Sequence, residues 1–211
     1  MNDASGPRQQ RDAAATQQKI LDSAEAEFSR HGLKGARVGA IAKGAGVTTA
    51  MIHYYFANKE GLYRAVLQRP VAQVQDLIDD FDLAQYESVE AAMTRLIELM
   101  VTYEAAHPQR QMLWFQEANQ NGGEYFKEGN WPGIYEQMLV VLDRGIQAGV
   151  FRPVEDRLLT LLHIIGLVIF YFTVHENWKH VTPDVDRFSA EEIQKHTDAA
   201  TTFVLQGLKQ L

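Results

Sequence analysis

Cysteine is absent from this chain of 211 residues. Its absence excludes a disulfide scaffold, a thiol nucleophile and a zinc site with cysteine ligands. Proline and glycine are present at ordinary levels, which excludes collagen-like and proline-rich chains. Hairpin signals are scarce as well, because the Asn-Gly pair at Asn121 is not flanked by alternating apolar residues. Helix-forming Ala, Leu, Gln and Glu are plentiful, so the sequence predicts an all-α protein.

Long uninterrupted hydrophobic runs are also missing. The most apolar segment, residues 158–174, is broken by polar residues and a glycine, and it is short for a bilayer span. The first twelve residues are polar and unlike a signal peptide. We therefore expect a cytoplasmic protein with no membrane partner. In so small a chain one apolar helix is not expected to be covered on every side, so its excess face predicts a homodimer.

Charge is distributed unevenly along the chain. Residues 1–70 carry ten Lys and Arg against six Asp and Glu, a formal net charge of +4. Residues 71–211 carry ten against 21, a formal net charge of −11. A basic N-terminal segment joined to an acidic remainder suggests that the N-terminal segment binds a polyanion. A chance distribution of solvated surface charges would give the same totals, so this alternative remains open.

Apolar periodicity and helix-end signals divide the chain into short helices followed by long ones. Gly32 is expected to end the first helix, Asn58 to cap the fourth, Pro70 to kink or break the fourth, and Ser189 to cap the last. The expected helices span about residues 13–31, 38–43, 49–56, 59–81, 88–106, 109–121, 132–148, 153–178 and 190–209.

Residues 36–62 contain a short helix, a turn at Gly44–Gly46 and a second short helix. This order is typical of a helix-turn-helix, whose second helix enters the DNA major groove. Thr48 offers a hydroxyl and backbone N–H groups at a helix start, an arrangement that binds phosphate. Lys59 begins the next helix and would add a cation there. An ordinary helical hairpin has similar spacing, so both interpretations remain open at this point.

The same segment resembles the DNA-binding domain of the TetR family of transcriptional regulators over about residues 14–65. Residues 147–153 also resemble the junction before the eighth helix of that family. The matching residues are Ile20, Leu21, Ala24, Phe28, Gly32, Gly35, Val38, Ile41, Ala42, Ala45, Gly46, Val47, Thr48, Ile52, Tyr54, Tyr55, Phe56, Asn58, Lys59, Glu60 and Leu62.

The resemblance implies an N-terminal three-helix DNA-binding head and a C-terminal helical regulatory domain. It places a flexible arm at residues 1–12, the helix-turn-helix domain at 13–58, and a ligand-sensing and dimerisation domain at 59–211. The implied function is a homodimeric repressor that a small-molecule effector releases from a palindromic double-stranded operator. No catalytic residue, cofactor or metal is implied.

The resemblance also implies roles for individual residues. Arg37 stands where the family often has Thr or Ser, and its side chain is expected to reach a phosphate or a groove edge. Phosphate contacts are implied for Thr48, His53 or Tyr54, and Lys59. Base-edge contacts are implied for Thr49, Ala50, Met51 and Tyr55.

Aromatic residues around Gly122 and Gly123 suit an apolar effector cavity, although such clusters also form cores. For His163, a core or interface histidine is the alternative to a ligand contact. The candidate effector-binding residues are Met100, Tyr103, Trp114, Phe126, His163 and Phe170.

Two other function classes remain. A helical enzyme with an aromatic pocket would lack any recognisable catalytic motif, and His175 and His180 are too far apart around a helix to form a zinc motif. A protein-interaction module would use the basic head to bind an acidic protein. Steep salt dependence of binding to duplex DNA would distinguish a DNA-binding regulator from both.

Overall fold

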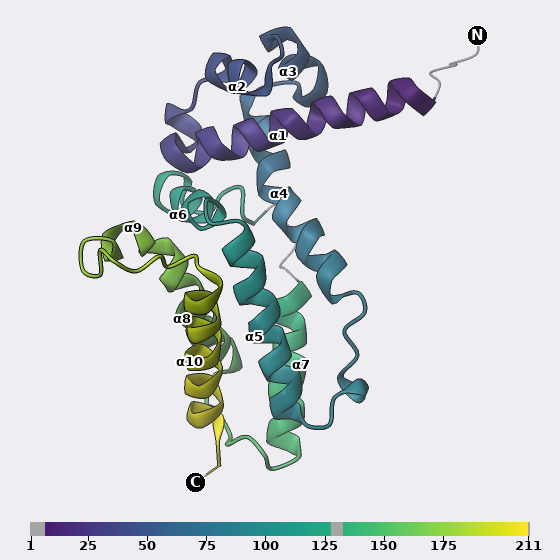
Figure 1. The fold of residues 1–211 in the computed structure, drawn as a ribbon. Helices are drawn as coiled ribbons and strands as arrows, with labels where there is room; N and C mark the ends of the chain where they lie inside the picture. The colour runs from purple at the N-terminus through teal and green to yellow at the C-terminus, as the bar shows by residue number, and fades with distance from the viewer. Residues whose placement is uncertain (1–6, 128–132, 211) are drawn as a thin grey trace. The chain divides into compact units, whose positions relative to one another are not determined.

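The computed structural model describes residues 7–127 and 133–210, which form helices joined by short connections (Figure 1). The all-α class predicted from the sequence is confirmed. No helix in these two ranges has the length and apolar character needed to cross a membrane. The elements are α1 (Pro7–Gly35), α2 (Val38–Ala45), α3 (Thr49–Phe56), α4 (Lys59–Ile78), the 3-10 turn η1 (Leu83–Gln85), α5 (Val89–Ala106), α6 (Arg110–Asn121), α7 (Gly133–Gln147), α8 (Arg157–Thr173), α9 (His175–Trp178) and α10 (Ala190–Leu208).

The chain forms two compact units. Unit 1 comprises residues 1–70 and 112–130, and unit 2 comprises residues 71–111 and 131–211. The boundary expected at residue 58 therefore lies further along α4, and α6 contributes most of its length to unit 1. The physical reason is burial: Leu62 and Val66 of α4 and Leu113 of α6 have no exposed surface and pack in the core of unit 1.

The core of unit 1 is built on the apolar stripe of α1, as its periodicity predicts. The ring of Phe28 meets the ring of Tyr63 edge to face, with centroids 4.9 Å apart. Arg69 of α4 adds ion pairs to two acids of α1, Asp22 at 2.6 Å and Glu25 at 3.4 Å. The buried residues of this core include Ile20, Ala24, Phe28, Ile41, Ile52, Leu62, Tyr63, Val66 and Leu113.

In unit 2, α5 contacts α7, α8 and α10, and α8 lies beside α10 (Figure 1). Ser88 caps α5 by accepting a hydrogen bond from the Ala91 N–H at 3.1 Å. Gly145 of α7 leaves room for the ring of Phe151, which a Cβ would strike. The buried residues include Met93, Leu96, Ile97, Met100, Val101, Met138, Val141, Phe151, Leu161, Val168, Phe172 and Val204.

Helix boundaries near the N-terminus differ in part from expectation. The predicted arm at residues 1–12 is helical from Pro7 onward, whereas residues 1–6 lie outside the described ranges. Gly32 has the positive φ of 63° expected at a helix end, although a short further turn continues to Gly35. Pro70 does not break α4, which is continuous from Lys59 to Ile78.

Two later boundaries also differ. The helix predicted over residues 153–178 is wrong at both ends. It begins at Arg157 because the Asp156 carboxylate accepts from the N–H groups of Leu158 and Leu159, at 2.8 and 3.0 Å. It ends at Thr173, and α9 follows as a separate short helix. Pro132, the expected start of α7, lies outside the described residues.

Candidate nucleic-acid interface

The turn between α2 and α3 is shorter than the sequence suggests. Gly46 ends α2 in the left-handed conformation, with φ 67°, which only glycine adopts without strain. Gly44, expected in the turn, lies inside α2 instead. A Cβ there would strike the Ser23 hydroxyl, which donates to the Ile41 carbonyl at 2.9 Å. Gly44 therefore allows α1 and α2 to pack closely rather than the chain to turn.

The turn leads directly into α3, the expected recognition helix. Thr48 has extended backbone angles and caps α3, as predicted, by accepting a long hydrogen bond of 3.4 Å from the Met51 N–H. Ile52 is fully buried, and Tyr55 and Phe56 pack partly against the core of unit 1. These three residues fix one side of α3 against the core, so the other side is left exposed.

The connection from α3 to α4 is held by local hydrogen bonds. His53 Nδ1 lies 3.2 Å from the Ala57 carbonyl, which can only accept, so Nδ1 carries the proton. The Asn58 carboxamide oxygen accepts from the Gly61 N–H at 2.7 Å and caps α4, as the sequence predicts. The start of α4 is thereby positioned beside the end of α3.

Lys59 begins α4, and its ammonium donates to the Lys34 carbonyl at 3.3 Å, near the end of α1. A lysine ammonium has three donors, so two are left for other acceptors. The backbone N–H of Arg37 donates to the Glu27 carboxylate at 3.0 Å, and its side chain is exposed. The ammonium of Lys59 and the backbone of Arg37 are therefore held close to the helix-turn-helix.

The proposed DNA-contacting residues differ in exposure. The Tyr54 side chain has 83% of its surface exposed, and its ring meets that of Tyr55 edge to face at 5.1 Å. Met51, Tyr55 and Lys59 are half-buried. The exposed members of the set are Arg37, Thr48, Thr49, Ala50, His53 and Tyr54.

Sequence reasoning missed a buried polar network in unit 1. Glu117 of α6 is 1% exposed, and its carboxylate accepts from the Tyr63 hydroxyl at 3.0 Å, the Asn121 amide at 2.7 Å and the Tyr125 N–H at 2.8 Å. Burial together with the adjacent Glu117 charge raises the pKa of Tyr63, so its hydroxyl stays protonated and donates. The single acid in the apolar stretch of α6 is the only sequence signal for this network, and it is a weak one.

A second buried polar cluster lies in unit 2. Glu104 of α5 is 8% exposed and accepts from the Gln111 amide of α6. Arg110 is 2% exposed, and its guanidinium donates to the Tyr103 hydroxyl. Burial raises the pKa of Glu104 to about 7, against the opposing effects of Gln111 and Arg110.

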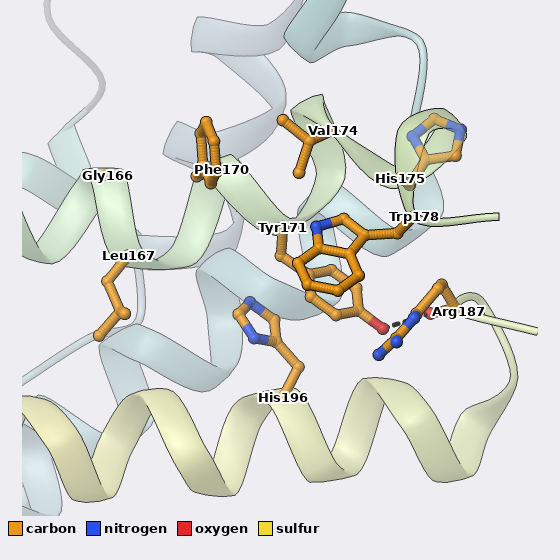
Figure 2. Close-up of a pocket in the computed structure, with 9 residues that line it drawn as sticks. All are labelled: Gly166, Leu167, Phe170, Tyr171, Val174, His175, Trp178, Arg187 and His196. Atoms are coloured by element: carbon orange, nitrogen blue, oxygen red, sulfur yellow. Dashed lines mark hydrogen bonds between the residues drawn. The ribbon is translucent and has the colours of Figure 1, made fainter. Parts of the chain in front are cut away.

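Neither unit by itself contains all six candidate effector residues. Met100 and Tyr103 are buried in the core of unit 2, where His163 and Phe170 lie exposed on α8. Trp114 and Phe126 belong to unit 1 and meet edge to face, with ring centroids 5.3 Å apart. Phe170 lines a pocket of about 410 Å³ in unit 2, formed by α8, α9, the loop that follows and α10 (Figure 2).

Two family models match this chain, one near the N-terminus and one over the following helices. Residues 20–66 match the model for bacterial regulatory proteins of the tetR family, and residues 90–204 match a tetracyclin repressor-like C-terminal domain. The HTH-type transcriptional repressor SCO4008 of Streptomyces coelicolor is 28% identical over 84% of each chain. The regulatory protein RaaS of Mycobacterium tuberculosis is 30% identical over 75% of this chain and 72% of its own.

Solved structures share the fold. The haemolysin II transcriptional regulator HlyIIR matches 94% of this chain and 99% of its own, with a TM-score of 0.64 and 22% identity. FadR of Bacillus subtilis, solved in complex with stearoyl-CoA, matches 90% and 98%, with a TM-score of 0.68 and 19% identity. The chain therefore belongs to the TetR family and is a DNA-binding transcriptional regulator rather than an enzyme.

Proposed function

We propose that this protein is a homodimeric repressor that reads a palindromic operator with α3 and is released from it by a small-molecule effector. The observation that carries the proposal is the geometry of α3, which is fixed to the core by Ile52 and exposes Tyr54 and its neighbours on the opposite side. A recognition helix needs both features, because it must be rigid and must also reach base edges.

The ends of α3 and α4 provide the phosphate contacts in this proposal. Thr48 places a hydroxyl at the N-terminus of α3, where the helix dipole favours an anion. Lys59 supplies two remaining ammonium donors, and the exposed side chain of Arg37 adds a third charged or polar group. These contacts set the position of the head on the duplex and carry no sequence information themselves.

The base-reading surface is poor in strong hydrogen-bonding groups. Ala50 and Met51 can make apolar contacts, for which thymine methyl groups are suitable partners. Thr49, His53 and Tyr54 supply the exposed polar atoms. We infer that part of the sequence preference comes from DNA shape and deformability rather than from bidentate base contacts.

The dimer interface is proposed on α8 and α10 of unit 2. Exposed apolar side chains recur along α8, with Leu158 64%, Leu162 60% and Phe170 63% exposed, and α10 adds Phe203 at 72%. Several large apolar side chains exposed on two helices that contact each other suit an isologous contact with a second copy. Two heads related by this symmetry would read two half-sites of an inverted repeat.

Repression and release by an effector are supported by the relatives rather than by the fold. SCO4008 is named as a repressor, and the FadR structure contains stearoyl-CoA. A ligand can release DNA only by binding more tightly to a conformation that fits the operator less well. Because α4 and α6 each continue from one unit into the other, they are the helices through which such a change would pass.

Selection of bound sequences from a random duplex library tests the proposal as a whole. We expect the purified full-length protein to recover an inverted repeat whose half-sites are centred about one helical turn apart. Recovery of unrelated sequences, or of a single half-site without its mirror image, would contradict the proposal.

A double variant tests the phosphate contacts. Thr48→Ala with Lys59→Ala should weaken binding to specific and non-specific duplexes by a similar factor. A dimer would lose two cations, so the slope of log affinity against log salt should become shallower by about 2. Thr102→Ala with Lys179→Ala, at exposed positions of unit 2, is the matched control. Unchanged affinity and slope in the first variant would remove both residues from the interface.

A further inference from the structure

The turn between α3 and α4 has an unusual backbone. Ala57, which follows α3, has φ 63° and ψ −53°, and among the described residues it alone combines a side chain with a positive φ. The N–H of Asn58 donates to the Phe56 carbonyl at 2.7 Å across it. These values define the strained form of the γ-turn, which is rare. Strained backbone persists only where its surroundings hold it, so the contacts of Ala57 are of functional interest.

His53 makes two of these contacts. The Ala57 N–H donates to the His53 carbonyl at 3.0 Å, and His53 Nδ1 donates to the Ala57 carbonyl at 3.2 Å. The N–H of Gly61 donates to the Asn58 carboxamide at 2.7 Å instead, so the imidazole supplies the donor that the Ala57 carbonyl needs. The ring is therefore held in one orientation, with Nδ1 toward the turn.

This orientation determines the chemistry of the second ring nitrogen. A neutral imidazole has one N–H, so when Nδ1 donates, Nε2 carries a lone pair and can only accept. Nε2 lies on the edge of the ring away from the turn, and the His53 side chain is exposed. No donor to Nε2 is found among the described residues. His53 therefore offers a free hydrogen-bond acceptor at the surface of α3.

The acceptor lies on the side of α3 that is turned away from the core. Thr49 and Ala50 come one helical turn before His53, and both are exposed. At about 100° per residue, His53 falls between them around the helix. The buried Ile52 lies outside this arc. Nε2 therefore belongs to the same surface that is proposed to enter the major groove, and its two small neighbours leave it accessible.

Only some groups on DNA can satisfy this acceptor. In the major groove the exocyclic amines of adenine and cytosine donate, whereas guanine and thymine present acceptors, as do the phosphates. We propose that His53 reads a base by accepting, through Nε2, a hydrogen bond from the exocyclic amine of an adenine or a cytosine. This inference rests on the proposed function. Of His53 and Tyr54, for which the family resemblance implies a phosphate contact, it leaves that contact to the Tyr54 hydroxyl, which has a proton to donate.

The position of the proton can be measured without DNA. Long-range nitrogen–proton correlation spectra of the full-length protein show which ring nitrogen of each histidine is protonated. At pH 8 histidine side chains are ordinarily neutral, and the spectrum of His53→Asn identifies the His53 signals by their loss. We expect a proton on Nδ1 and none on Nε2. A proton on Nε2 would overturn the proposal and would leave the proposed function unaffected.

Removal of single amines from the DNA tests the contact itself. In the duplex recovered by selection, each adenine is replaced in both half-sites by 2-aminopurine, which still pairs with thymine but has no amine in the major groove. Each cytosine is likewise replaced by 2-pyrimidinone, which lacks the N4 amine. At one position this loss should weaken binding of the original protein at pH 8 by about tenfold or more. The base at that position distinguishes adenine from cytosine.

Two variants connect that position to His53. His53→Asn keeps a donor for the Ala57 carbonyl and lacks the outer acceptor. It should bind the intact duplex about tenfold more weakly and lose less than about twofold more when the amine is removed. His53→Gln brings an amide oxygen to about the place of Nε2 and should remain sensitive to the amine. His31→Asn, at another exposed histidine of unit 1, should respond as the original protein does. Circular dichroism confirms folding of each variant.

The outcomes separate this inference from the proposed function. Equal sensitivity of the original protein and His53→Asn at every position would overturn the base contact, while the recovered inverted repeat would still support the proposed function. A neutral ring displaces no counterion, so the slope of log affinity against log salt at pH 8 should be the same for both proteins. A slope shallower by about 2 in His53→Asn would show a cation on a phosphate and overturn the proposal. Recovery of no repeat would contradict the proposed function and this inference with it.

Discussion

Ile52 and Tyr54 lie two positions apart on α3, yet one is fully buried and the other is 83% exposed. Ile52→Ala should therefore lower the free energy of unfolding by about 2–5 kcal/mol through lost burial and the remaining cavity. Tyr54→Ala should change it by less than about 0.5 kcal/mol while weakening operator binding. Urea denaturation and gel-shift titration of both variants check the contrast. A destabilised Tyr54→Ala protein would show that this ring supports the fold rather than reads DNA.

Glu104 gives stability a pH dependence with a definite sign. Its pKa rises from 4.5 in the unfolded reference to about 7 in the fold, because burial disfavours the carboxylate. Between these values the folded state holds a proton that the unfolded chain has released, so the free energy of unfolding falls as pH rises from about 4.5 to 7. Glu104→Gln keeps an acceptor for Gln111 without this titration. Denaturation curves across that range should show a flatter pH profile for the variant.

The half-exposed acid of α5, Glu98, provides the control for that experiment. Glu98→Gln removes an ion pair with Arg95 at 3.4 Å and leaves the buried cluster intact. Its pH profile should match that of the original protein. If the free energy of unfolding fell equally steeply with pH in the original protein and in Glu104→Gln, Glu104 would not be the group that titrates.

Single residues also show how far the sequence can be interpreted. Thr48, Asn58 and Ser189 were predictable as caps because a cap needs only a local pattern. The position of Gly44 inside α2 cannot be predicted from the sequence, because its close approach to Ser23 depends on how α1 and α2 pack. Glu117 was missed because its partners Tyr63 and Tyr125 come from other segments, and no local pattern marks a buried acid.

Among the helices, α8 shows why a boundary can be misplaced. Pro153 is a good first residue for a helix, so the sequence predicts that the helix starts there. The carboxylate of Asp156 accepts two backbone N–H groups at 2.8 and 3.0 Å and fixes the start at Arg157 instead. The apolar pattern then continues past Thr173, so periodicity alone could not separate α8 from α9.

The cap itself can be tested. Asp156→Ala should destabilise the protein by about 1 kcal/mol, because two N–H groups of the first turn lose their acceptor. Asp156→Asn keeps an acceptor and should cost less. Glu155→Ala, at the exposed neighbouring position, should have little effect. Thermal unfolding of the three variants gives the order, and equal stability of Asp156→Ala and Glu155→Ala would contradict the capping role.

At the level of the whole molecule, the family, the helical class and the head were predictable because the helix-turn-helix pattern is short and dense. The division of α6 between the two units could not be predicted, because it depends on contacts of Leu113 and Glu117 with residues far away in the sequence. The surplus apolar face of α8 was expected from composition, and the structure places exposed leucines and a phenylalanine along that helix.

The exposed apolar face of α8 leads to a prediction that links dimerisation to DNA binding. Leu162→Glu places a charge on the proposed interface, and in an isologous contact the two carboxylates would lie close together without partners. Sedimentation should then show the monomer mass, and operator affinity should fall about 100-fold or more because the second head loses its effective concentration. Leu77→Glu alters a side chain on α4 that is 47% exposed and serves as the control, which should remain dimeric and bind DNA normally. If Leu162→Glu were dimeric with full affinity, the two heads would have to be joined through another surface, and the apolar stripe of α8 would require a different partner.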